Sequence, residues 1–344
     1  MRTGRSERSA GASHGTSNLP TSRIIGTGSY APLKVLTNAD LENLVATNDQ
    51  WIVTRTGIKE RRIAAEGEET SDMAAEASRR ALDLAGVSAE EIDLLIVATV
   101  TGDAPTPSCA VFVQNKIGAH KASAFDVSAA CAGSLYGLVI ADQFIRSGAV
   151  KRALVIGAER LSRVVDWTNR ETCVLFGDAA GAMVLAPALD EDRGLLASIL
   201  RTDGSMTGVL GIYDHDLGPL AKSQEPESPA RIRMRGREVY KAAVRLLPEA
   251  VKAALDQAGL EADDVTHVIA HQANLRIIES ALETLGVPIE KCWTNIDRYG
   301  NTSSASMPIT LDEANRAGRL KPGDVIAMMA IGAGLTWGAA ILRW

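Results

Sequence analysis

The chain repeats part of its own sequence, and this internal similarity constrains its fold more than any other feature. Residues 81–99 read ALDLAGVSAEEIDLLIVAT, and residues 254–272 read ALDQAGLEADDVTHVIAHQ, at an offset of 173. Two further pairs follow in the same order: 141–151 with 311–321 at an offset of 170, and 177–186 with 334–343. Three ordered matches predict two similar halves that meet between residues 190 and 230.

The length of 344 residues fits two halves of about 170 residues each. Residues 70–85 have helical spacing after a Thr or Ser cap, whereas residues 92–100, 153–157 and 182–185 are apolar runs typical of strands covered on both faces. This alternation predicts an α/β protein with helices packed against sheets.

The start of the chain and the connection between the two halves lack a regular pattern of apolar residues. Residues 1–22 are rich in Ser, Gly, Arg and Thr and are expected to form a disordered tail, although an organelle transit peptide has a similar composition. The first half is then residues 23–190 and the second residues 191–344, with packing beginning near Ile24 and an exposed connection at 214–231. The tail lies outside both halves.

Composition excludes several classes of protein. Acids outnumber bases by 42 to 36, no basic block dominates any segment, and only 4% of residues are aromatic, which argues against a nucleic-acid or anionic-membrane surface. No apolar run of about 18 residues exists to span a bilayer. The four cysteines are widely spaced without a C-x-x-C pair, which excludes a disulfide framework and indicates a reducing, cytoplasmic setting.

Cys131 lies in the small-residue segment SAACAGS, at the start of a helix predicted over residues 131–147. The positive end of a helix dipole and nearby N–H groups lower the pKa of a thiol and favour the nucleophilic thiolate. A buried structural cysteine is the alternative interpretation. Cys109, Cys173 and Cys292 lack this setting and are expected in or near the core.

The duplication places a second residue opposite Cys131. An offset of 170 leads from Cys131 to Asn301, which also follows an Asp-containing strand and opens a run of small residues. If the halves pack about a pseudo-twofold axis, the two helix starts face each other across a shared site, although Asn at a helix start is otherwise a cap. His271 follows the apolar run 268–270, at a strand end where α/β proteins place their sites.

Metal and dinucleotide chemistry are not supported. His267 and His271 stand four residues apart, but a strand pattern separates them, so they are not expected to bind a metal ion. No G-x-G-x-x-G is followed by an acidic residue. The turn at Gly332–Gly334 is instead a candidate to bring backbone N–H groups to an oxyanion.

The segments AACAG, HQANLRI and GNTSSAS, with IIGTGSY and DQWIVTRTGIKER near the start, resemble β-ketoacyl-[acyl-carrier-protein] synthase III, a condensing enzyme of the thiolase superfamily. The resemblance runs from Arg23 to Trp344. It implies a duplicated thiolase fold with five layers, α/β/α/β/α, two halves related by a pseudo-twofold axis, and a homodimer.

The resemblance also implies a mechanism. Cys131 attacks an acyl-CoA thioester and holds the acyl group, and His271 and Asn301 then hydrogen-bond the thioester carbonyl of malonyl-carrier protein. Loss of CO2 leaves an enolate that attacks the acyl-Cys131 thioester, while backbone N–H groups of Cys131 and Ala333 stabilise the oxyanion. Because loss of the carboxylate drives carbon–carbon bond formation, no metal or redox cofactor is expected. The reaction would initiate fatty-acid synthesis.

Positions for CoA and for the carrier protein follow from the same resemblance. Adenine is expected between Trp51 and Arg55, through stacking and cation–π contact. The other positions matched to CoA are Thr47, Arg170, Gly236 and Asn274. The positions matched to docking of an acidic carrier protein, despite the net charge of −6, are Lys241, Gln272, Ala273, Asn274, Leu275 and Arg276.

Three positions depart from the family pattern. The terminal Gly-Gly-Gly-Phe loop of the family reads GAGL at 332–335, where Ala333 keeps its N–H. Glu171 replaces a small Gly near the nucleotide, which leaves the affinity for CoA open. Thr106 stands where many members place an aromatic side chain that closes the acyl pocket from the partner subunit.

Two other functions fit parts of the pattern. A specialised relative could use Cys131, His271 and Asn301 to join unusual acyl chains in a polyketide-type pathway, or to pass acyl groups to oxygen or nitrogen. A non-catalytic subunit that only shapes a partner's tunnel is disfavoured, because such proteins tend to lose the nucleophile.

The small Thr106 predicts a primer pocket that accepts acyl chains beyond acetyl. In competition assays with mixed acyl-CoA primers, chains of about six to twelve carbons should enter the product alongside acetyl, because the pocket lacks a bulky closing group. Activity with acetyl-CoA and none with the longer chains would contradict this prediction.

Overall fold

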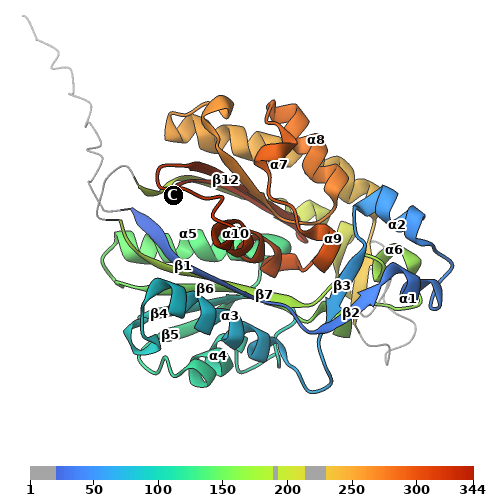
Figure 1. Ribbon diagram of the computed structural model, residues 1–344, viewed down its shortest axis with the longest axis horizontal. Helices are drawn as coiled ribbons and strands as arrows, with labels where there is room; N and C mark the ends of the chain where they lie inside the picture. Colours follow the sequence, from blue (N-terminus) through green and yellow to red (C-terminus); the bar gives the residue numbers. More distant parts are fainter. Residues whose placement is uncertain (1–20, 189–192, 214–229) are drawn as a thin grey trace, which may run out of the picture.

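The structure is a computed structural model that describes residues 21–188, 193–213 and 230–344. Two β-sheets lie face to face, with one layer of helices between them and one layer outside each sheet (Figure 1). The chain therefore has the five-layer α/β/α/β/α arrangement that the resemblance implied.

The first sheet comes from the first half of the chain. Its strands stand in the order β1-β7-β6-β4-β5, and only β7 runs against the others. The strands are β1 (Ser22–Tyr30), β4 (Leu94–Ala98), β5 (Ser123–Val127), β6 (Ala153–Glu159) and β7 (Ala179–Pro187).

The second sheet repeats this order with one strand fewer. Its strands stand in the order β11-β12-β13-β8, and only β13 runs against the others. The place of β5 is taken by Cys292, which forms an isolated parallel bridge with Val268. The internal similarity of the sequence thus corresponds to a repeated strand order in the two sheets. The strands are β8 (Gly194–Thr202), β11 (His267–Ala270), β12 (Val325–Gly332) and β13 (Thr336–Arg343).

Helices cover the outer faces of both sheets and fill the space between them. The outer layers are α3 and α4 on the first sheet and α7 and α8 on the second, whereas α5 and α10 share one buried cluster with strands of both sheets. These helices are α3 (Thr70–Ala85), α4 (Cys109–Ile117), α5 (Gly133–Arg146), α7 (Gly236–Ala258), α8 (Leu275–Leu285) and α10 (Ser306–Arg316).

The central strands are almost entirely apolar because helices cover both of their faces, and Glu159 at the end of β6 is the exception. Every residue of β4 (LLIVA), β6 (ALVIGAE) and β12 (VIAMMAIG) is buried. Such strands read as continuous apolar runs rather than as alternating ones. The predicted strands at 92–100, 153–157 and 182–185 are confirmed, with slightly different ends.

The two central helices are equivalent but differ in length. Their first residues, Gly133 and Ser306, lie 173 positions apart, whereas their last residues lie 170 apart, because α5 has 14 residues and α10 has 11. The sequence offset between the two halves therefore changes from 173 at the start of this helix to 170 at its end. Applying 170 to Cys131 is wrong by three residues: its counterpart is Ser304, not Asn301.

Each central helix is entered through a strained turn. The 3₁₀ turns η2 (Ala130–Ala132) and η7 (Ser303–Ala305) come directly before α5 and α10. Their first residues, Ala130 and Ser303, have φ angles of 47° and 49°, a region that residues other than glycine rarely adopt. The same backbone conformation at both positions reflects the equivalence of the two turns.

Strand glycines make room for these turns, and each comes from the opposite half. A Cβ on Gly157 of β6 would lie 2.1 Å from the carbonyl oxygen of Ser304, and a Cβ on Gly332 of β12 would lie 2.5 Å from the backbone nitrogen of Cys131. No side chain fits at such distances. Each half therefore holds the helix start of the other.

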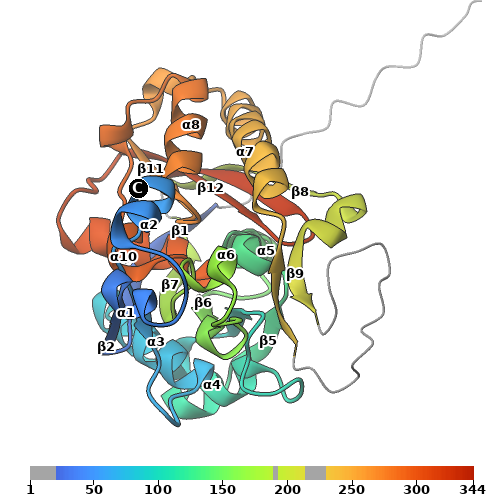
Figure 2. The ribbon, with the colours of Figure 1, turned by 90° about the vertical axis from the view of Figure 1, so that its right-hand side faces the viewer.

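Shorter elements gather at one end of the layers, on the side that faces the viewer in Figure 2. Most of them contribute to a separate buried cluster, here called the cap cluster. They are β2 (Lys34–Thr37), α1 (Asn38–Glu42), α2 (Asp49–Thr56), β3 (Glu60–Ile63), α6 (Arg170–Cys173), β9 (Leu210–Tyr213), β10 (Arg231–Met234) and α9 (Ile296–Tyr299). The remaining 3₁₀ turns are η1 (Ala89–Glu91), η3 (Leu161–Arg163), η4 (Gly204–Val209), η5 (Ala262–Asp264) and η6 (Ile289–Lys291).

The first outer helix has the predicted bounds but a different cap. α3 spans Thr70–Ala85, and its N-cap is Glu69, whose N–H donates to the Asp72 carboxylate at 3.0 Å. The predicted Thr or Ser cap is wrong because the Thr70 hydroxyl donates to the carbonyl of Thr101 at 2.5 Å instead.

Packing begins slightly earlier than predicted. Ser22 is already buried, and its N–H and hydroxyl both donate to Asp142 Oδ1, so the fold begins before Ile24 and inside the expected tail 1–22. The boundary at 190/191 and nearly all of the expected connection at 214–231 lie outside the described residues. Within the described ranges, no helix has the length and apolar character needed to cross a membrane.

The tight fit at Gly157 makes a stability prediction. Gly157→Ala should lower the free energy of unfolding by about 2 kcal/mol or more, because its Cβ overlaps the Ser304 backbone. Urea unfolding would measure the loss. Gly204→Ala is the control, since nothing lies within 4 Å of a Cβ there. Equal stabilities for the two variants would contradict the prediction.

Candidate active site

A cavity of about 1090 Å³ connects the cap elements to the starts of the central helices. It brings together the three residues predicted to be catalytic, Cys131, His271 and Asn301, which are all buried. Exposed basic residues line other parts of the same cavity, namely Arg55, Arg170, Lys241 and Arg276. The cavity therefore leads from a charged surface to a buried thiol.

The thiol of Cys131 is strongly desolvated. Its residue is 7% exposed, and burial raises the pKa of the thiol to about 12. A hydrogen bond from the Ser303 hydroxyl lowers this pKa, and the negative charge of Glu159 raises it further. The prediction that the helix start favours the thiolate is therefore wrong, because desolvation outweighs it. At neutral pH the thiol is protonated.

His271 follows β11, where its N–H donates to the Met329 carbonyl at 2.8 Å. Its Nδ1 lies 2.6 Å from Ser306 Oγ, which also accepts the N–H of Gln272 at 3.2 Å. When the Ser306 hydroxyl donates its proton to Nδ1, the ring proton lies on Nε2. Burial lowers the pKa of His271 to about 3, so the neutral ring presents an Nε2–H donor.

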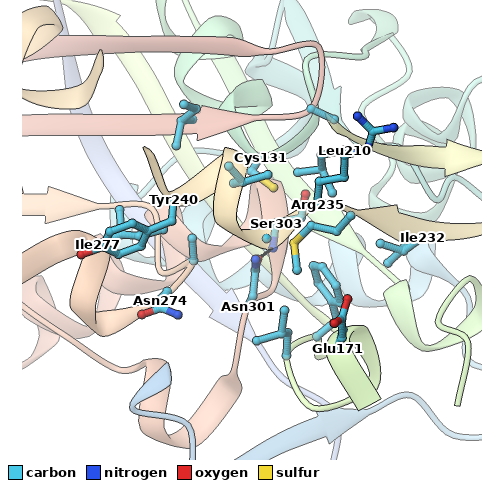
Figure 3. Close-up of a pocket in the computed structure, with 18 of the residues that line it drawn as sticks. Cys131, Glu171, Leu210, Ile232, Arg235, Tyr240, Asn274, Ile277, Asn301 and Ser303 are labelled. Carbon is cyan, nitrogen blue, oxygen red and sulfur yellow. Dashed lines mark hydrogen bonds between the residues drawn. The ribbon is translucent and has the colours of Figure 1, made fainter. Parts of the chain in front are cut away.

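Asn301 is oriented by its backbone and by its neighbour. Its N–H donates to the Leu175 carbonyl at 2.8 Å, and its carbonyl accepts from Gly177 at 3.1 Å. Its side-chain Oδ1 accepts the N–H of Ser303 at 2.8 Å, which leaves Nδ2 as the end that can donate to a substrate carbonyl. Cys131, Ser303 and Asn301 lie together at the centre of Figure 3.

Ala333 lies in the turn between β12 and β13, on the wall of the same cavity. Its carbonyl accepts the Thr336 hydroxyl at 3.0 Å. Among the described residues other than glycine, only Ala130 and Ser303 have a positive φ, so Ala333 sits in ordinary backbone geometry. Alanine in place of the family's glycine therefore adds no strain here, and its N–H stays compatible with the predicted oxyanion role.

Trp51 lies at the outer part of the cavity with two arginines against its ring. The guanidinium carbons of Arg55 and Arg170 each lie 4.5 Å from the ring centroid. Arg170 also donates to the carbonyl of Ala46 at 2.9 Å. The predicted Trp51–Arg55 pair is present. Arg170 also stacks on Trp51, a contact that the sequence did not predict.

The other positions matched to CoA fall in different places. Gly236 and Asn274 line the cavity. Asn274 also caps α8, where its Oδ1 accepts the N–H of Arg276 and its Nδ2 donates to the Arg55 carbonyl, both at 2.9 Å. Thr47 does not line the cavity, and its Oγ1 is buried without a hydrogen-bond partner.

Two of the basic residues form a rim on α7 and α8. Lys241 and Arg276 are exposed and line the cavity, and the Arg276 guanidinium lies 5.9 Å from the Tyr240 ring centroid. Ala273 lines the cavity beside them, whereas Leu275 packs against the cap cluster. These positions suit contact with a partner at the cavity mouth.

The placement of Gln272 on the carrier-protein surface is wrong. Gln272 is fully buried. Its Nε2 donates to the Ala270 carbonyl at 2.9 Å, and its Oε1 accepts the N–H of Asn295 at 3.2 Å. Its side chain joins the end of β11 to the segment before α9 and cannot reach a docked protein.

The two remaining departures from the family pattern, Glu171 and Thr106, differ in whether they line the cavity. Glu171 lines the cavity next to Arg170 and adds a negative charge there. Thr106 is exposed in the loop before α4 and does not line the cavity of a single chain. A role for Thr106 in the acyl pocket thus requires a second subunit.

Three buried polar residues near the catalytic groups were not found from the sequence: Glu159, Ser303 and Ser306. Ser303 and Ser306 stand in the GNTSSAS motif, but their contacts depend on the first half and on β11. Glu159 carried a usable signal, since it is an acid at the end of the apolar strand ALVIGAE. Apolar cavity walls were also missed, and they come from β9 and β10: Leu210, Ile212, Ile232 and Met234.

The other cysteines and His267 have structural positions. Cys109 and Cys173 are fully buried and Cys292 is half-buried, and none of them lines the cavity. His267 Nε2 lies 3.2 Å from Asp324 Oδ2. Across the described ranges, no cluster of three or more His, Cys, Asp or Glu residues is arranged to hold a metal ion.

A buried cysteine at a helix start, a neutral histidine and an oriented asparagine amide, all on one cavity of a duplicated five-layer fold, define a condensing enzyme of the thiolase type. Profiles of 3-oxoacyl-[acyl-carrier-protein] synthase III match residues 125–204, and profiles of its C-terminal part match residues 255–344.

Curated proteins and solved structures agree with the profiles. The chain is 51% identical over 328 residues to β-ketoacyl-[acyl-carrier-protein] synthase III of Symbiobacterium thermophilum, covering 93% of this chain and 97% of the relative. It is 52% identical to the β-ketoacyl-[acyl-carrier-protein] synthase III of Geobacillus kaustophilus, and the match covers 93% of this chain and 98% of that relative. The crystal structure of the synthase III from Aquifex aeolicus has a TM-score of 0.88 at 49% identity, covering 94% of this chain and all of that one. The chain belongs to the β-ketoacyl-[acyl-carrier-protein] synthase III family.

The lowered pKa of His271 predicts the pH dependence of decarboxylation. An ordinary imidazole becomes protonated below about pH 6.5, whereas His271 keeps its neutral form down to about pH 3. CO2 release from malonyl-carrier protein by acylated enzyme should therefore show no inflection between about pH 5 and 8. An inflection near pH 6.5 that disappears in His271→Ala would contradict this.

Proposed function

We propose that this chain catalyses the decarboxylating condensation of an acyl-CoA primer with malonyl-[acyl-carrier-protein], through an acyl group held on Cys131. As a member of its family the chain is an acyl-transferring condensing enzyme of fatty-acid synthesis. The observation that carries the proposal is one cavity that joins Cys131, His271 and Asn301 to a basic, aromatic mouth at Trp51.

Acylation is the first step. The Cys131 sulfur attacks the thioester carbonyl carbon, the proton of its thiol passes to the departing CoA sulfur, and CoA leaves as its thiol. The carbonyl oxygen becomes an oxyanion, for which the backbone N–H groups of Cys131 and Ala333 on the cavity wall are the proposed donors. The close fit of Gly332 against Cys131 supports this, because it holds the two N–H groups on facing turns.

Decarboxylation and condensation follow on the acyl-enzyme. Asn301 Nδ2 and His271 Nε2–H donate to the thioester carbonyl of the malonyl group, so that the negative charge left by CO2 is stabilised on oxygen. The enolate carbon attacks the acyl-Cys131 carbonyl and expels the sulfur, which releases a 3-oxoacyl thioester. Loss of CO2 generates the carbanion directly, so the proposed reaction uses no metal and no cofactor beyond the CoA thioester.

The mouth of the cavity supports binding of CoA and of the carrier protein. Trp51 offers an aromatic face, and Arg55 and Arg170 already lie against it, so an adenine ring would take the place of one guanidinium. Lys241 and Arg276 form the exposed basic rim that an acidic carrier protein would contact.

The comparisons favour fatty-acid synthesis over a polyketide pathway. The synthase III relatives are 51% and 52% identical, whereas the priming β-ketosynthase of a polyketide biosynthetic pathway is 36% identical, with a TM-score of 0.87. Apolar side chains of β9 and β10 on the cavity wall support an aliphatic primer.

We also infer a homodimer in the cytoplasm. β5 is the edge strand of the first sheet and pairs only with β4 in a single chain, and exposed strand edges are normally covered. Val111 of the neighbouring α4 is 42% exposed, and Thr106 comes just before that helix. A second copy at this edge would cover all three. The four free thiols suit a reducing compartment.

The proposed function is tested by intact mass spectrometry. Incubation with acyl-CoA should add one acyl mass to the wild-type chain and none to Cys131→Ala. His271→Ala and Asn301→Ala should keep the adduct but lose about 100-fold or more in condensation with malonyl-carrier protein, because the enolate loses a donor. Wild-type protein that gains no acyl mass on Cys131 would contradict the proposed function.

A further inference from the structure

A single carboxylate on α10 gathers the segment of the chain that leads to Asn301. Glu313 accepts five hydrogen bonds, and all five come from residues 293–299. Its side chain is 17% exposed and lines a surface groove, outside the cavity that holds Cys131. The proposed mechanism gives Glu313 no role, so this concentration of contacts requires an explanation.

The two oxygens of the carboxylate divide the donors between them. Oε1 accepts from Arg298 Nη1 and from the Tyr299 hydroxyl, both at 2.9 Å. Oε2 accepts from Arg298 Nη2 and Asn295 Nδ2, both at 2.9 Å, and from Trp293 Nε1 at 3.3 Å. Burial by itself would raise the pKa of the Glu313 carboxyl, but the hydrogen bonds from Arg298 and Asn295 lower that pKa below its ordinary value. The group is therefore an ionised carboxylate that is saturated with donors.

These contacts hold the short helix that precedes Asn301. α9 spans Ile296–Tyr299 and lies beside α10 (Figure 1). Only Gly300 separates α9 from Asn301, and its φ is 64°. A Cβ on Gly300 would lie 2.6 Å from the Leu175 carbonyl oxygen, so the backbone is tightly confined there. A shift of α9 against α10 would therefore move the amide of Asn301.

The same carboxylate reaches His271 through Asn295. The Asn295 N–H donates to Gln272 Oε1 at 3.2 Å, while its Nδ2 donates to Glu313. Gln272 directly follows His271, and its N–H donates to Ser306 Oγ, which lies 2.6 Å from His271 Nδ1. Ser306 and Glu313 stand seven residues apart on α10, which is about two helical turns, so they share one face of the helix. That face supports both groups that donate to the malonyl carbonyl.

The nucleophile is held by other elements. Cys131 lies in η2, where Gly332 of β12 packs so closely that a Cβ on it would lie 2.5 Å from the Cys131 backbone nitrogen. Neither η2 nor β12 provides any of the five donors to Glu313. A change at Glu313 should therefore affect the two donors of the decarboxylation step and leave the thiol in place.

We propose that Glu313 is a positioning residue for decarboxylation, whose carboxylate places Asn301 Nδ2 and His271 Nε2 within hydrogen-bonding distance of the malonyl thioester carbonyl. Donors to a developing oxyanion act at about 2.7–3.1 Å, and a misplacement of about 1 Å can cost about 100-fold in rate. The proposal rests on the proposed function, because it assigns the support for the second step of that reaction.

The test measures the two half-reactions separately. Acylation of Cys131 by acyl-CoA is followed by rapid quench and intact mass, and CO2 release from malonyl-carrier protein is followed on enzyme that has been acylated beforehand. Glu313→Gln should lower the rate of CO2 release by about 10- to 100-fold and change the acylation rate by less than about threefold, because its amide NH2 opposes the donors. The KM for malonyl-carrier protein should change little, since the rim of Lys241 and Arg276 is intact.

Two further variants test the path from Glu313 to the donors. Tyr299→Phe removes one of the five donors and leaves the pair of Arg298 and Glu313 in place, so it should slow CO2 release by about fivefold without slowing acylation. In Asn301→Ala protein, Glu313→Gln should lower CO2 release by a smaller factor than in the wild type, because one of the two groups that it positions is already missing.

Asp312→Asn is the matched control. Asp312 precedes Glu313 on α10 and is 1% exposed, and it accepts the hydroxyls of Thr27 and Ser29 as well as Arg316 Nε. It joins α10 to β1 rather than to α9. Its loss should destabilise the fold, while the ratio of the two half-reaction rates stays that of the wild type.

The outcomes separate the role of Glu313 from the function on which it rests. Equal losses in both half-reactions of Glu313→Gln would mean that Glu313 is only structural and would overturn the proposal, as would an unchanged rate of CO2 release. If Glu313→Gln does not fold, Tyr299→Phe decides, and CO2 release at the wild-type rate overturns the proposal. A wild type that forms no acyl adduct refutes the proposed function itself.

Discussion

The site depends on how closely each half of the chain approaches the helix start of the other. Gly332 of the second half lies against the Cys131 backbone, and Gly157 of the first half lies against Ser304. These contacts leave no room for side chains, and they press two strained turns together at the centre of the molecule. Catalytic groups from both halves can then share one cavity. A single half contains neither the close contact nor a complete site.

Burial then decides the charge of each group in that cavity. Desolvation keeps the thiol of Cys131 protonated and the imidazole of His271 neutral, which makes the first a poor nucleophile alone and the second a hydrogen-bond donor. Glu159 is fully buried and accepts the Val100 N–H and the hydroxyls of Thr101 and Ser303. The same low-polarity surroundings that strengthen fixed donors toward an enolate therefore also keep both groups in their neutral forms.

Much of the fold could be predicted from local pattern, because strands covered on both faces must be apolar throughout, and α3 was bounded correctly by its helical spacing. The errors came from tertiary contacts. The cap of α3 moved to Glu69 since Thr70 bonds a distant carbonyl, and the counterpart of Cys131 shifted because α10 is three residues shorter than α5. Gln272 sits in a docking motif but is buried.

By itself, the sequence determined the duplication, the alternation of helices and strands, and the motifs that contain Cys131, His271 and Asn301, since these follow from local residue order. Only the tertiary structure decided how these groups are charged and oriented. Glu159 and Ser303 stand 144 positions apart, yet they bond at 3.1 Å. A pKa and a hydrogen-bond direction depend on what surrounds a group in space, and those surroundings come mostly from the other half of the chain.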